Sequence, residues 1–390
     1  MLEESQISQK FLLFEERFGR GEVIDAYYAP GRVNLIGDHT DYNGGMVLPL
    51  AIEKGTYLLI RRTELPPCRL YSANLDLEAR ILTSELEPKG DWADYLRGVY
   101  KYSSENCGTL PPFDAYYFGD LPLESGLSSS ASIEVVTARA MNSLGCAMSP
   151  ADEVKVAWRA ENEFVGIPCG IMDQYAVAFA EKGHCLLLNC ENMEHRQVPF
   201  NIRDCVLVVG NTGMPRNLAE TEYRKRRLEC GEALEALSAR LGPRTCLSNV
   251  SVKEFESARW GLPDLLARRA EHVIYENVRV EEAARCLQAG DARTLGHLMN
   301  RSHESLRDLY EVSTHELDAL QRISLEQQGV LGSRMTGAGF GGCVVSLVAR
   351  EGLERYLRRT PGLYWQATHE EAEFTVTTPG DGARRLREAT

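Results

Sequence analysis

The stretch that most narrows the fold and chemistry of this chain is residues 29–50, APGRVNLIGDHTDYNGGMVLPL. Apolar residues flank a polar centre in which Arg32, Asp38, His39 and Asp41 lie among glycines and asparagines. Glycine permits tight turns and a close approach of the backbone to a ligand. This density of hydrogen-bonding groups suits a polyhydroxylated ligand. An ordinary surface loop of turn-forming residues is the alternative, but it would not explain the apolar residues on both sides.

A second segment, LPLESGLSSSAS at residues 121–132, precedes apolar residues that recur at helical spacing from Ile133 to Leu144. The first turn of a helix carries unpaired N–H groups and the positive end of the helix dipole, which together bind phosphate. Serine hydroxyls add hydrogen-bond donors, and one of them can ligate Mg²⁺. A serine-rich helix cap without a ligand is the alternative. The pattern GxxxxGK(S/T) is absent, so a Walker-type phosphate loop is excluded.

Two carboxylates further along the chain are candidates for chemistry. Glu161 falls on the inward-facing stripe of a helix predicted at residues 151–165, where a carboxylate needs a metal, a cation or hydrogen-bond donors. It is therefore either a metal ligand or part of a structural ion pair. Asp173, in the sequence GIMDQ at residues 170–174, either caps the helix that follows or accepts a proton from a substrate hydroxyl.

A glycine-rich segment, RMTGAGFGGC at residues 334–343, leads into an apolar run typical of a strand. It is either a tight junction between loop and strand or a place where backbone passes close to the site. Tyr223 lies in the charged segment TEYRKRRLEC at residues 221–230. Taken alone, it is an ordinary residue of an amphipathic helix.

In their order along the chain, these segments resemble the motifs of galactokinases, a branch of the GHMP small-molecule kinase family. The resemblance spans roughly residues 10–380. It implies a two-domain GHMP kinase fold of the α+β class, with an N-terminal domain related to the second domain of ribosomal protein S5 and a ferredoxin-like C-terminal domain. It also implies ATP and Mg²⁺ as cofactors and galactose as substrate, with transfer of the γ-phosphate to the sugar 1-hydroxyl.

The resemblance implies a role for each candidate residue. Asp173 is the catalytic base, and Arg32 lies beside it. The sugar-binding residues are Asp38, His39, Asp41 and Tyr223, and the metal ligands are Ser129 and Glu161. The nucleotide-binding residues are Gly126, Leu127, Ser128, Ser129, Ser130, Ala131 and, as a wall beside the adenine, Trp92.

Three positions depart from the galactokinase pattern. Asp38 stands where the family usually has the glutamate that contacts the sugar 6-hydroxyl, and Asn189 stands where it usually has aspartate. Glu124 lies in the phosphate loop, where a carboxylate repels phosphate unless it points outward or pairs with a cation. Two alternatives therefore stay open: a kinase of a related hexose such as N-acetylgalactosamine, and a galactokinase-like sugar sensor without turnover.

Strands and helices interleave in both halves of the chain, which favours the α+β class. We place the boundary between an N-terminal domain, residues 1–200, and a C-terminal domain, residues 201–390. The expected strands include residues 47–52, 56–62, 185–188, 205–209, 343–348 and 374–379. The expected helices include residues 92–102, 151–165, 216–241, 280–289 and 303–328.

Composition excludes several classes of protein. The 390 residues carry a net charge of −13, so a broad basic face for nucleic acid is not expected. No apolar run is long enough to span a bilayer, and the N-terminal residues MLEESQ do not resemble a signal peptide. The 11 cysteines contain no CxxC pair, which predicts buried reduced thiols rather than disulfides or zinc ligands. We expect a cytoplasmic protein without nucleic-acid or membrane partners, and a monomer.

Overall fold

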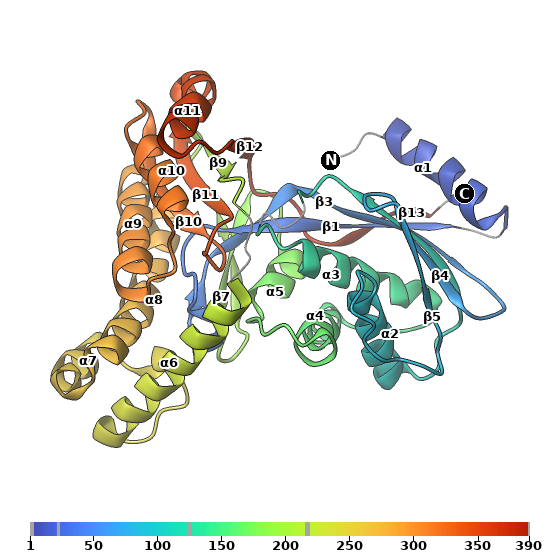
Figure 1. The fold of residues 1–390 in the computed structure, drawn as a ribbon, viewed down its shortest axis with the longest axis horizontal. Coiled ribbons are helices and arrows are strands. Elements are labelled where there is room, and N and C mark those ends of the chain that lie inside the picture. The colour runs from blue at the N-terminus through green and yellow to red at the C-terminus, as the bar shows by residue number, and fades with distance from the viewer. Residues whose placement is uncertain (1–3, 22–23, 123–125, 215–218, 389–390) are drawn as a thin grey trace.

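The structure, a computed structural model, describes residues 4–21, 24–122, 126–214 and 219–388. Within these residues the strands form sheets of six, four and three strands, and helices cover them (Figure 1). This mixture of helices with largely antiparallel sheets confirms the predicted α+β class. Among the helices of the described residues, none combines the length and the apolar character needed to cross a bilayer.

The six-stranded sheet has the order β13-β1-β3-β6-β4-β5 and carries helices on both faces (Figure 1). Successive side chains of a strand point to opposite faces. Leu58 and Ile60 of β3 therefore enter the core against α2–α5, whereas Tyr57 and Leu59 enter a smaller core against α1. The strands are β1 (Asp25–Asn34), β3 (Pro49–Arg62), β4 (Cys68–Ser72), β5 (Leu77–Ile81), β6 (Phe113–Gly119) and β13 (Arg384–Glu388). The helices are α1 (Glu4–Phe18), α2 (Asp94–Cys107), α3 (Ser129–Met141), α4 (Pro150–Arg159) and α5 (Met172–Phe179).

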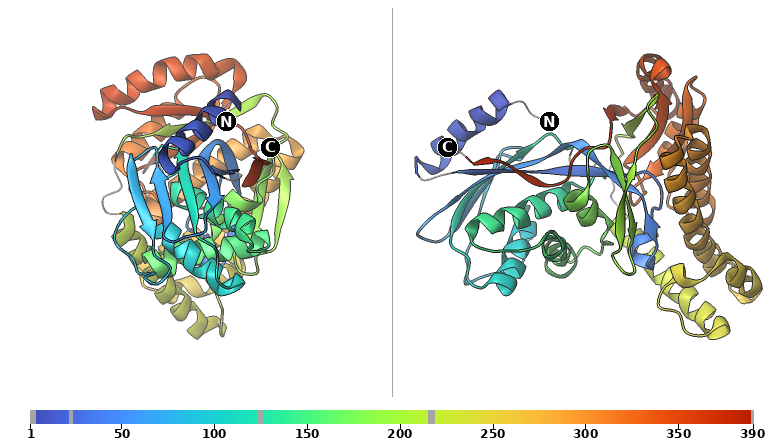
Figure 2. Two further views of the ribbon diagram at one scale, coloured as in Figure 1. Left: turned by 90° about the vertical axis from the view of Figure 1, so that its right-hand side faces the viewer. Right: turned by 180° about the vertical axis from the view of Figure 1, so that it is seen from behind.

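The four-stranded sheet, of order β10-β11-β9-β12, is antiparallel and lies in a second lobe with the later helices (Figure 2). One core joins the lobes, because Val33 and Leu35 from the start of the chain pack in one cluster with Val280, Val345 and Leu347. The strands are β9 (Cys205–Asn211), β10 (Val330–Thr336), β11 (Cys343–Ala349) and β12 (Glu373–Thr377). The helices are α6 (Ala219–Leu241), α7 (Val252–Ala258), α8 (Asp264–Ala289), α9 (Ala292–Ser305), α10 (His315–Leu325) and α11 (Leu353–Thr368).

The third sheet has the order β2-β7-β8, formed by β2 (Met46–Val47), β7 (His184–Asn189) and β8 (His195–Pro199). Asn189, one of the three departures, ends β7 and accepts a hydrogen bond from the Glu191 N–H at 2.9 Å. Aspartate makes the same local turn, so this departure has no structural consequence. The last strand, β13, returns to pair with β1 in the N-terminal sheet. The proposed division near residue 200 stays a prediction.

Several predicted elements differ from the structure, and the helix expected at 280–289 is only the C-terminal part of α8. The strands expected at 47–52 and 56–62 are one long strand, β3, preceded by the short β2. The helix expected at 303–328 is interrupted by a π-helical turn at Leu306–Tyr310 and by Glu311 at a left-handed φ of 56°. The Glu311 carboxylate is held there by Arg268 and Arg269 at 2.7 and 2.6 Å. Thr314 then caps the N-terminus of α10. A threonine at this place is a local signal for the start of a new helix, but the continuous apolar periodicity favoured one long helix.

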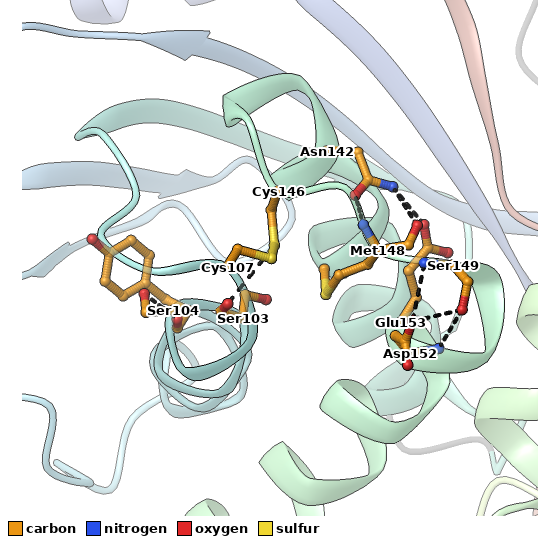
Figure 3. The surroundings of a disulfide bond; sticks show 10 residues. Ser103, Ser104, Cys107, Asn142, Cys146, Met148, Ser149, Asp152 and Glu153 are labelled. Atoms are coloured by element: carbon orange, nitrogen blue, oxygen red, sulfur yellow. Dashed lines mark hydrogen bonds between the residues drawn. A yellow bond between two sulfur atoms is a disulfide. The ribbon is translucent and has the colours of Figure 1, made fainter.

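The expectation that every cysteine is reduced is wrong for one pair. Cys107 at the end of α2 and Cys146 form a disulfide with their Cα atoms 5.2 Å apart, which links α2 to the turn before α4 (Figure 3). The pair is separated by 39 residues, and only the packing of α2 against α3 brings the two thiols together. The other nine cysteines form no disulfide. Those of β7, β9 and β11 are buried, as the apolar runs predicted.

Candidate active site

A cavity of about 580 Å³ lies where the polar segments of the sequence meet. Two loops form much of its wall: the sugar loop, residues 34–45, and the phosphate loop, residues 126–132. Most of the predicted site residues line this cavity. They are Arg32, Asp38, His39, Asp41, Gly126, Ser128, Ser129, Ser130, Glu161, Asp173 and Tyr223.

An ion pair between Arg32 of β1 and Asp173 of α5 lies at the cavity wall. The guanidinium donates through Nε and Nη2 to the two carboxylate oxygens, both at 2.8 Å. Its Nη1 donates to the carbonyl of Gly126 at 2.7 Å, which ties the pair to the phosphate loop. The N-cap of α5 is Ile171, and the Asp173 carboxylate faces Arg32. The alternative that Asp173 is a helix cap is therefore excluded.

The phosphate loop leads directly into α3, whose first helical residue is Ser129. Ser129 and Ser130, the first two residues of the helix, line the cavity, and a helix N-terminus can bind an anion. Ser128 precedes the helix in a left-handed conformation and donates its hydroxyl hydrogen to Asp173. The loop therefore contacts the candidate base as well as the space for phosphate. Glu124 lies outside the described residues.

Asp38 is buried between the sugar loop and the glycine-rich segment 334–343. Its Oδ1 accepts a hydrogen bond from the Gly337 N–H at 2.9 Å, and its Oδ2 lies 2.6 Å from Nη1 of Arg334. Burial raises the pKa of Asp38, and the charge of Arg334 opposes that rise. Arg334 is itself fully buried. Asp38 therefore anchors the sugar loop at the same time as it lines the cavity.

His39 follows with a positive φ of 64°, and both of its ring nitrogens have protein partners. Nε2 lies 3.0 Å from the carbonyl of Ala338, which can only accept, so Nε2 carries the proton. Nδ1 must then accept from the Tyr42 hydroxyl at 2.8 Å. Burial lowers the pKa of His39 to about 3, which keeps the ring neutral. His39 thus holds the sugar loop in place, and a direct contact of its ring with sugar stays a prediction.

Asp41 and Tyr223 face the cavity from opposite lobes. The Asp41 carboxylate packs so closely on Gly170 that any Cβ at that position would collide with it. Burial, followed by the charge of Asp173, raises the pKa of Asp41 to about 7. Tyr223 lies on α6, with its ring centroid 5.7 Å from that of His39. The two residues therefore line the same cavity.

Glu161 belongs to a π-helical turn, Ala160–Val165, that continues α4. Such turns are frequent at functional sites because they re-aim side chains. Its carboxylate accepts a hydrogen bond from Gln174 at 2.7 Å and one from the Cys169 thiol at 3.3 Å. Burial, followed by the charge of Asp173, raises the pKa of Glu161 to about 7. No ion pair among the described residues includes Glu161, so the structural ion-pair alternative does not hold.

The oxygen atoms of Glu161 and of the phosphate-loop serines suit a cation that is also coordinated by phosphate oxygens. Across the described residues, no cluster of three or more His, Cys, Asp or Glu side chains is arranged to hold a metal. Mg²⁺ usually needs only one or two protein ligands when phosphate oxygens and waters complete its octahedron. Glu161 with a serine hydroxyl of the phosphate loop fits that pattern, because Ser129, Ser130 and Glu161 line the same cavity.

A second cavity, of about 180 Å³, adjoins the first and shares Ser129 and Ser130 with it. Trp92 lines this second cavity together with Tyr95 and Tyr117. The two remaining predicted residues, Leu127 and Ala131, are buried in the cores and line neither cavity. Their side chains therefore pack in the cores beneath the phosphate loop and do not face a cavity.

Several residues of the site were not predicted to have a role. Arg334, Tyr42 and Ala338 hold the sugar loop, and Cys169 lines the cavity beside Glu161. For Arg334 the available signal was a charged residue at the start of a glycine-rich segment that leads into an apolar strand. Tyr42 lies three residues after its partner His39, whereas Ala338 carried no signal because its partner is set by how the lobes pack.

Comparison with known proteins shows the family of this chain. The models described as "Galactokinase galactose-binding signature", "GHMP kinases N terminal domain" and "GHMP kinases C terminal" match residues 12–62, 94–181 and 283–360. The galactokinase of Fusobacterium nucleatum is 39% identical, over 96% of this chain and 98% of its own length. The chain belongs to the galactokinase family.

Other members of the galactokinase family are similarly close. The galactokinase of Bacillus subtilis is 38% identical over 96% of this chain and 98% of its own length. The crystal structure of Lactococcus lactis galactokinase complexed with galactose is 35% identical, covers 98% of this chain and 100% of that chain, and has a TM-score of 0.92. Methanococcus jannaschii mevalonate kinase, at 20% identity and a TM-score of 0.67, shares the fold. The predicted GHMP kinase fold is confirmed.

Proposed function

We propose that this galactokinase-family protein transfers the γ-phosphate of ATP to the 1-hydroxyl of galactose, which yields galactose 1-phosphate and ADP. The observation that carries the proposal is the Arg32–Asp173 pair, in one cavity with the sugar loop and the phosphate loop. A base held between a sugar-binding surface and a phosphate-binding helix terminus is the arrangement that this transfer needs.

In the proposed reaction, Asp173 accepts the proton of the 1-hydroxyl as that oxygen attacks the γ-phosphorus. The bond between this phosphorus and the β–γ bridging oxygen breaks, and ADP leaves with the bridging oxygen. Arg32 orients Asp173 and offsets the negative charge that develops on the transferred group. Because a side chain within reach can take the proton directly, we infer in-line transfer without a phosphorylated enzyme.

We assign the sugar hydroxyls to Asp38, Asp41 and Tyr223, with His39 as the residue that holds their loop. A carboxyl with a pKa near 7, such as that of Asp41, can either accept or donate a hydrogen bond at neutral pH. The aromatic wall of the second cavity, which includes Trp92, supports placing the adenine there. Ser129 and Ser130 lie between the two spaces, where the phosphates would run.

Ser129 and Glu161 are the residues that we assign to Mg²⁺. When bound, the ion would supply positive charge that offsets the negative charge of the phosphates. A cytoplasmic location and a monomeric state stay predictions.

Replacement of Glu161 by glutamine is expected to raise the Mg²⁺ concentration at half-maximal activity by at least about tenfold. The amide keeps the hydrogen bonds but loses the charge that binds the cation, so galactose affinity should change little. Titrating activity against Mg²⁺ measures the effect. Glu163→Gln is the matched control, because Glu163 lies in the same π-helical turn but is exposed and paired with Arg159. An unchanged Mg²⁺ midpoint together with a lower Tm would show a structural role instead.

The shorter Asp38 is expected to discriminate the sugar 6-hydroxyl weakly, because its carboxylate is drawn toward Gly337 and Arg334. Asp38→Glu adds about 1.5 Å of reach. We expect its kcat/KM ratio for galactose over 6-deoxygalactose to rise by about tenfold, or about 1.4 kcal/mol. Steady-state kinetics with both sugars, and a Tm to confirm an intact fold, measure this. Equal ratios for the two forms would remove residue 38 from the 6-hydroxyl subsite.

The proposal itself is tested by ADP release with a panel of galactose, N-acetylgalactosamine, glucose and galacturonate. We expect galactose to have the highest kcat/KM. A preference for N-acetylgalactosamine would make the protein a kinase of that sugar. Galactose binding in calorimetry without ADP release from any sugar would make it a sensor, and efficient turnover of galacturonate would overturn the substrate assignment.

A further inference from the structure

Ser128 adopts a backbone conformation that a residue with a side chain rarely adopts. Its φ of 60° and ψ of 50° lie in the left-handed region, where the Cβ of an L-residue crowds the following carbonyl oxygen. Glycine accepts this conformation without that cost, and Gly126, two residues earlier, does so with a φ of 78°. A glycine at position 128 would therefore relieve the backbone strain. The presence of a serine there has to be explained by what its side chain does.

The Ser128 hydroxyl is committed to the candidate base. Its Oγ donates to Oδ2 of Asp173 at 2.5 Å, a short bond typical of an ionised acceptor. The ion-paired carboxylate can only accept, so the serine must be the donor. Within the described residues the hydroxyl makes no other hydrogen bond, and the side chain is buried. It therefore faces Asp173 rather than the space for phosphate.

This bond makes the two oxygens of Asp173 unequal. Oδ2 accepts from both Ser128 and Arg32, whereas Oδ1 accepts only from Nε of Arg32 among the described residues. A carboxylate oxygen offers about two acceptor positions. Oδ2 is therefore saturated, and Oδ1 keeps one open position. The Asp173 side chain is 24% exposed at the cavity wall, so this open position is accessible.

We propose that Ser128 is a positioning residue for Asp173: its hydroxyl occupies Oδ2 and leaves Oδ1 as the atom that takes the proton from the sugar. The inference rests on the proposed function and deepens it. The serine also couples the base to the nucleotide side, because Ser128 immediately precedes the first turn of α3. The backbone strain at Ser128 is then the cost of keeping a hydroxyl where glycine would fit better.

Two variants separate the hydroxyl from the backbone. Ser128→Ala keeps the strained Cβ and removes the hydroxyl, whereas Ser128→Gly removes both. We expect kcat to fall by about 10- to 100-fold in each, the size of a loss of orientation at a reacting group. KM for ATP and for galactose should change by less than threefold, and the Tm of Ser128→Gly should not lie below that of Ser128→Ala. Full activity in either variant would overturn the proposal.

A double-variant cycle shows whether Ser128 acts through Asp173. In an Asp173→Asn background there is no base to position, so adding Ser128→Ala should change the residual kcat by less than twofold. A full additional loss, together with a raised KM for ATP, would show that the hydroxyl contacts phosphate instead. If the Asp173→Asn background is too slow to measure, the split between kcat and KM in the single variants decides. Failure of the proposed function is distinct, because the unaltered protein would then release no ADP with galactose.

Discussion

Asp173→Asn is expected to lower kcat by at least about 100-fold, the size expected for the loss of a general base. Asparagine keeps the volume of the side chain, and its single oxygen can still accept from Arg32 Nη2 and Ser128, but its NH2 group can neither accept from Nε of Arg32 nor take up the proton. Galactose affinity should therefore change by less than about threefold, which is below about 0.7 kcal/mol. ADP release measures kcat, and calorimetry measures galactose binding.

The chain offers a matched control for this experiment. Arg307 and Asp308 form a bidentate pair with the same atoms, Nε to Oδ1 at 2.7 Å and Nη2 to Oδ2 at 2.8 Å, but both side chains are substantially exposed and neither lines the cavity. Asp308→Asn should leave kcat and KM unchanged. Turnover near the unaltered level in Asp173→Asn would show that Asp173 only pairs with Arg32, and the base would have to be sought elsewhere in the cavity.

Arg334→Met is expected to lower the free energy of unfolding by about 3–5 kcal/mol, because it leaves a buried carboxylate without its partner. Arg334 and Asp38 expose 0% and 1% of their side chains. Nη1 of Arg334 also donates to the carbonyls of Asn34 and Leu35 at 3.2 and 3.3 Å. The sugar loop should therefore lose its anchor along with the charge pair, and kcat/KM for galactose should fall. Urea unfolding measures the stability.

Two further variants show whether the stability lost in Arg334→Met comes from the buried ion pair. Arg322→Met breaks an ion pair with Glu326 in which the side chains are 62% and 58% exposed, and exposed pairs contribute no more than about 1 kcal/mol. Adding Asp38→Asn to Arg334→Met removes the orphaned charge and should recover part of the lost stability. If Arg334→Met is no less stable than Arg322→Met, the buried pair does not anchor the loop.

Much of the site could be predicted from sequence because its chemistry is local. The start of α3 at Ser129 follows from a glycine, a run of serines and helical periodicity, and the N–H groups of a first turn point along the axis of their own helix. The strands around Cys185, Cys205 and Cys343 were visible as short apolar runs. Asp173 could be identified as a candidate, although its local sequence was equally consistent with a helix cap.

What each side chain contacts was decided only by the tertiary structure. Asp38 meets Gly337 across 299 positions of sequence, and Ser128 meets Asp173 across 45. Neither periodicity nor composition contains the packing of segments that are distant in sequence, so these pairs had no local signal. The disulfide between Cys107 and Cys146 was missed for the same reason, since it depends on α2 packing against α3.

The sequence by itself determined which residue types were available at the site: a candidate base, a guanidinium, serines at a helix terminus, and carboxylates in a glycine-rich loop. The tertiary structure decided which of these groups are bonded within the protein and which stay open to the cavity. Asp38 and His39 are bonded to residues of the segment 334–338, whereas Oδ1 of Asp173 keeps an acceptor position open to the cavity. The physical reason is that the capacity to bond belongs to a side chain and is encoded locally. Whether a protein group has already occupied that capacity depends on which distant segments share the same buried space.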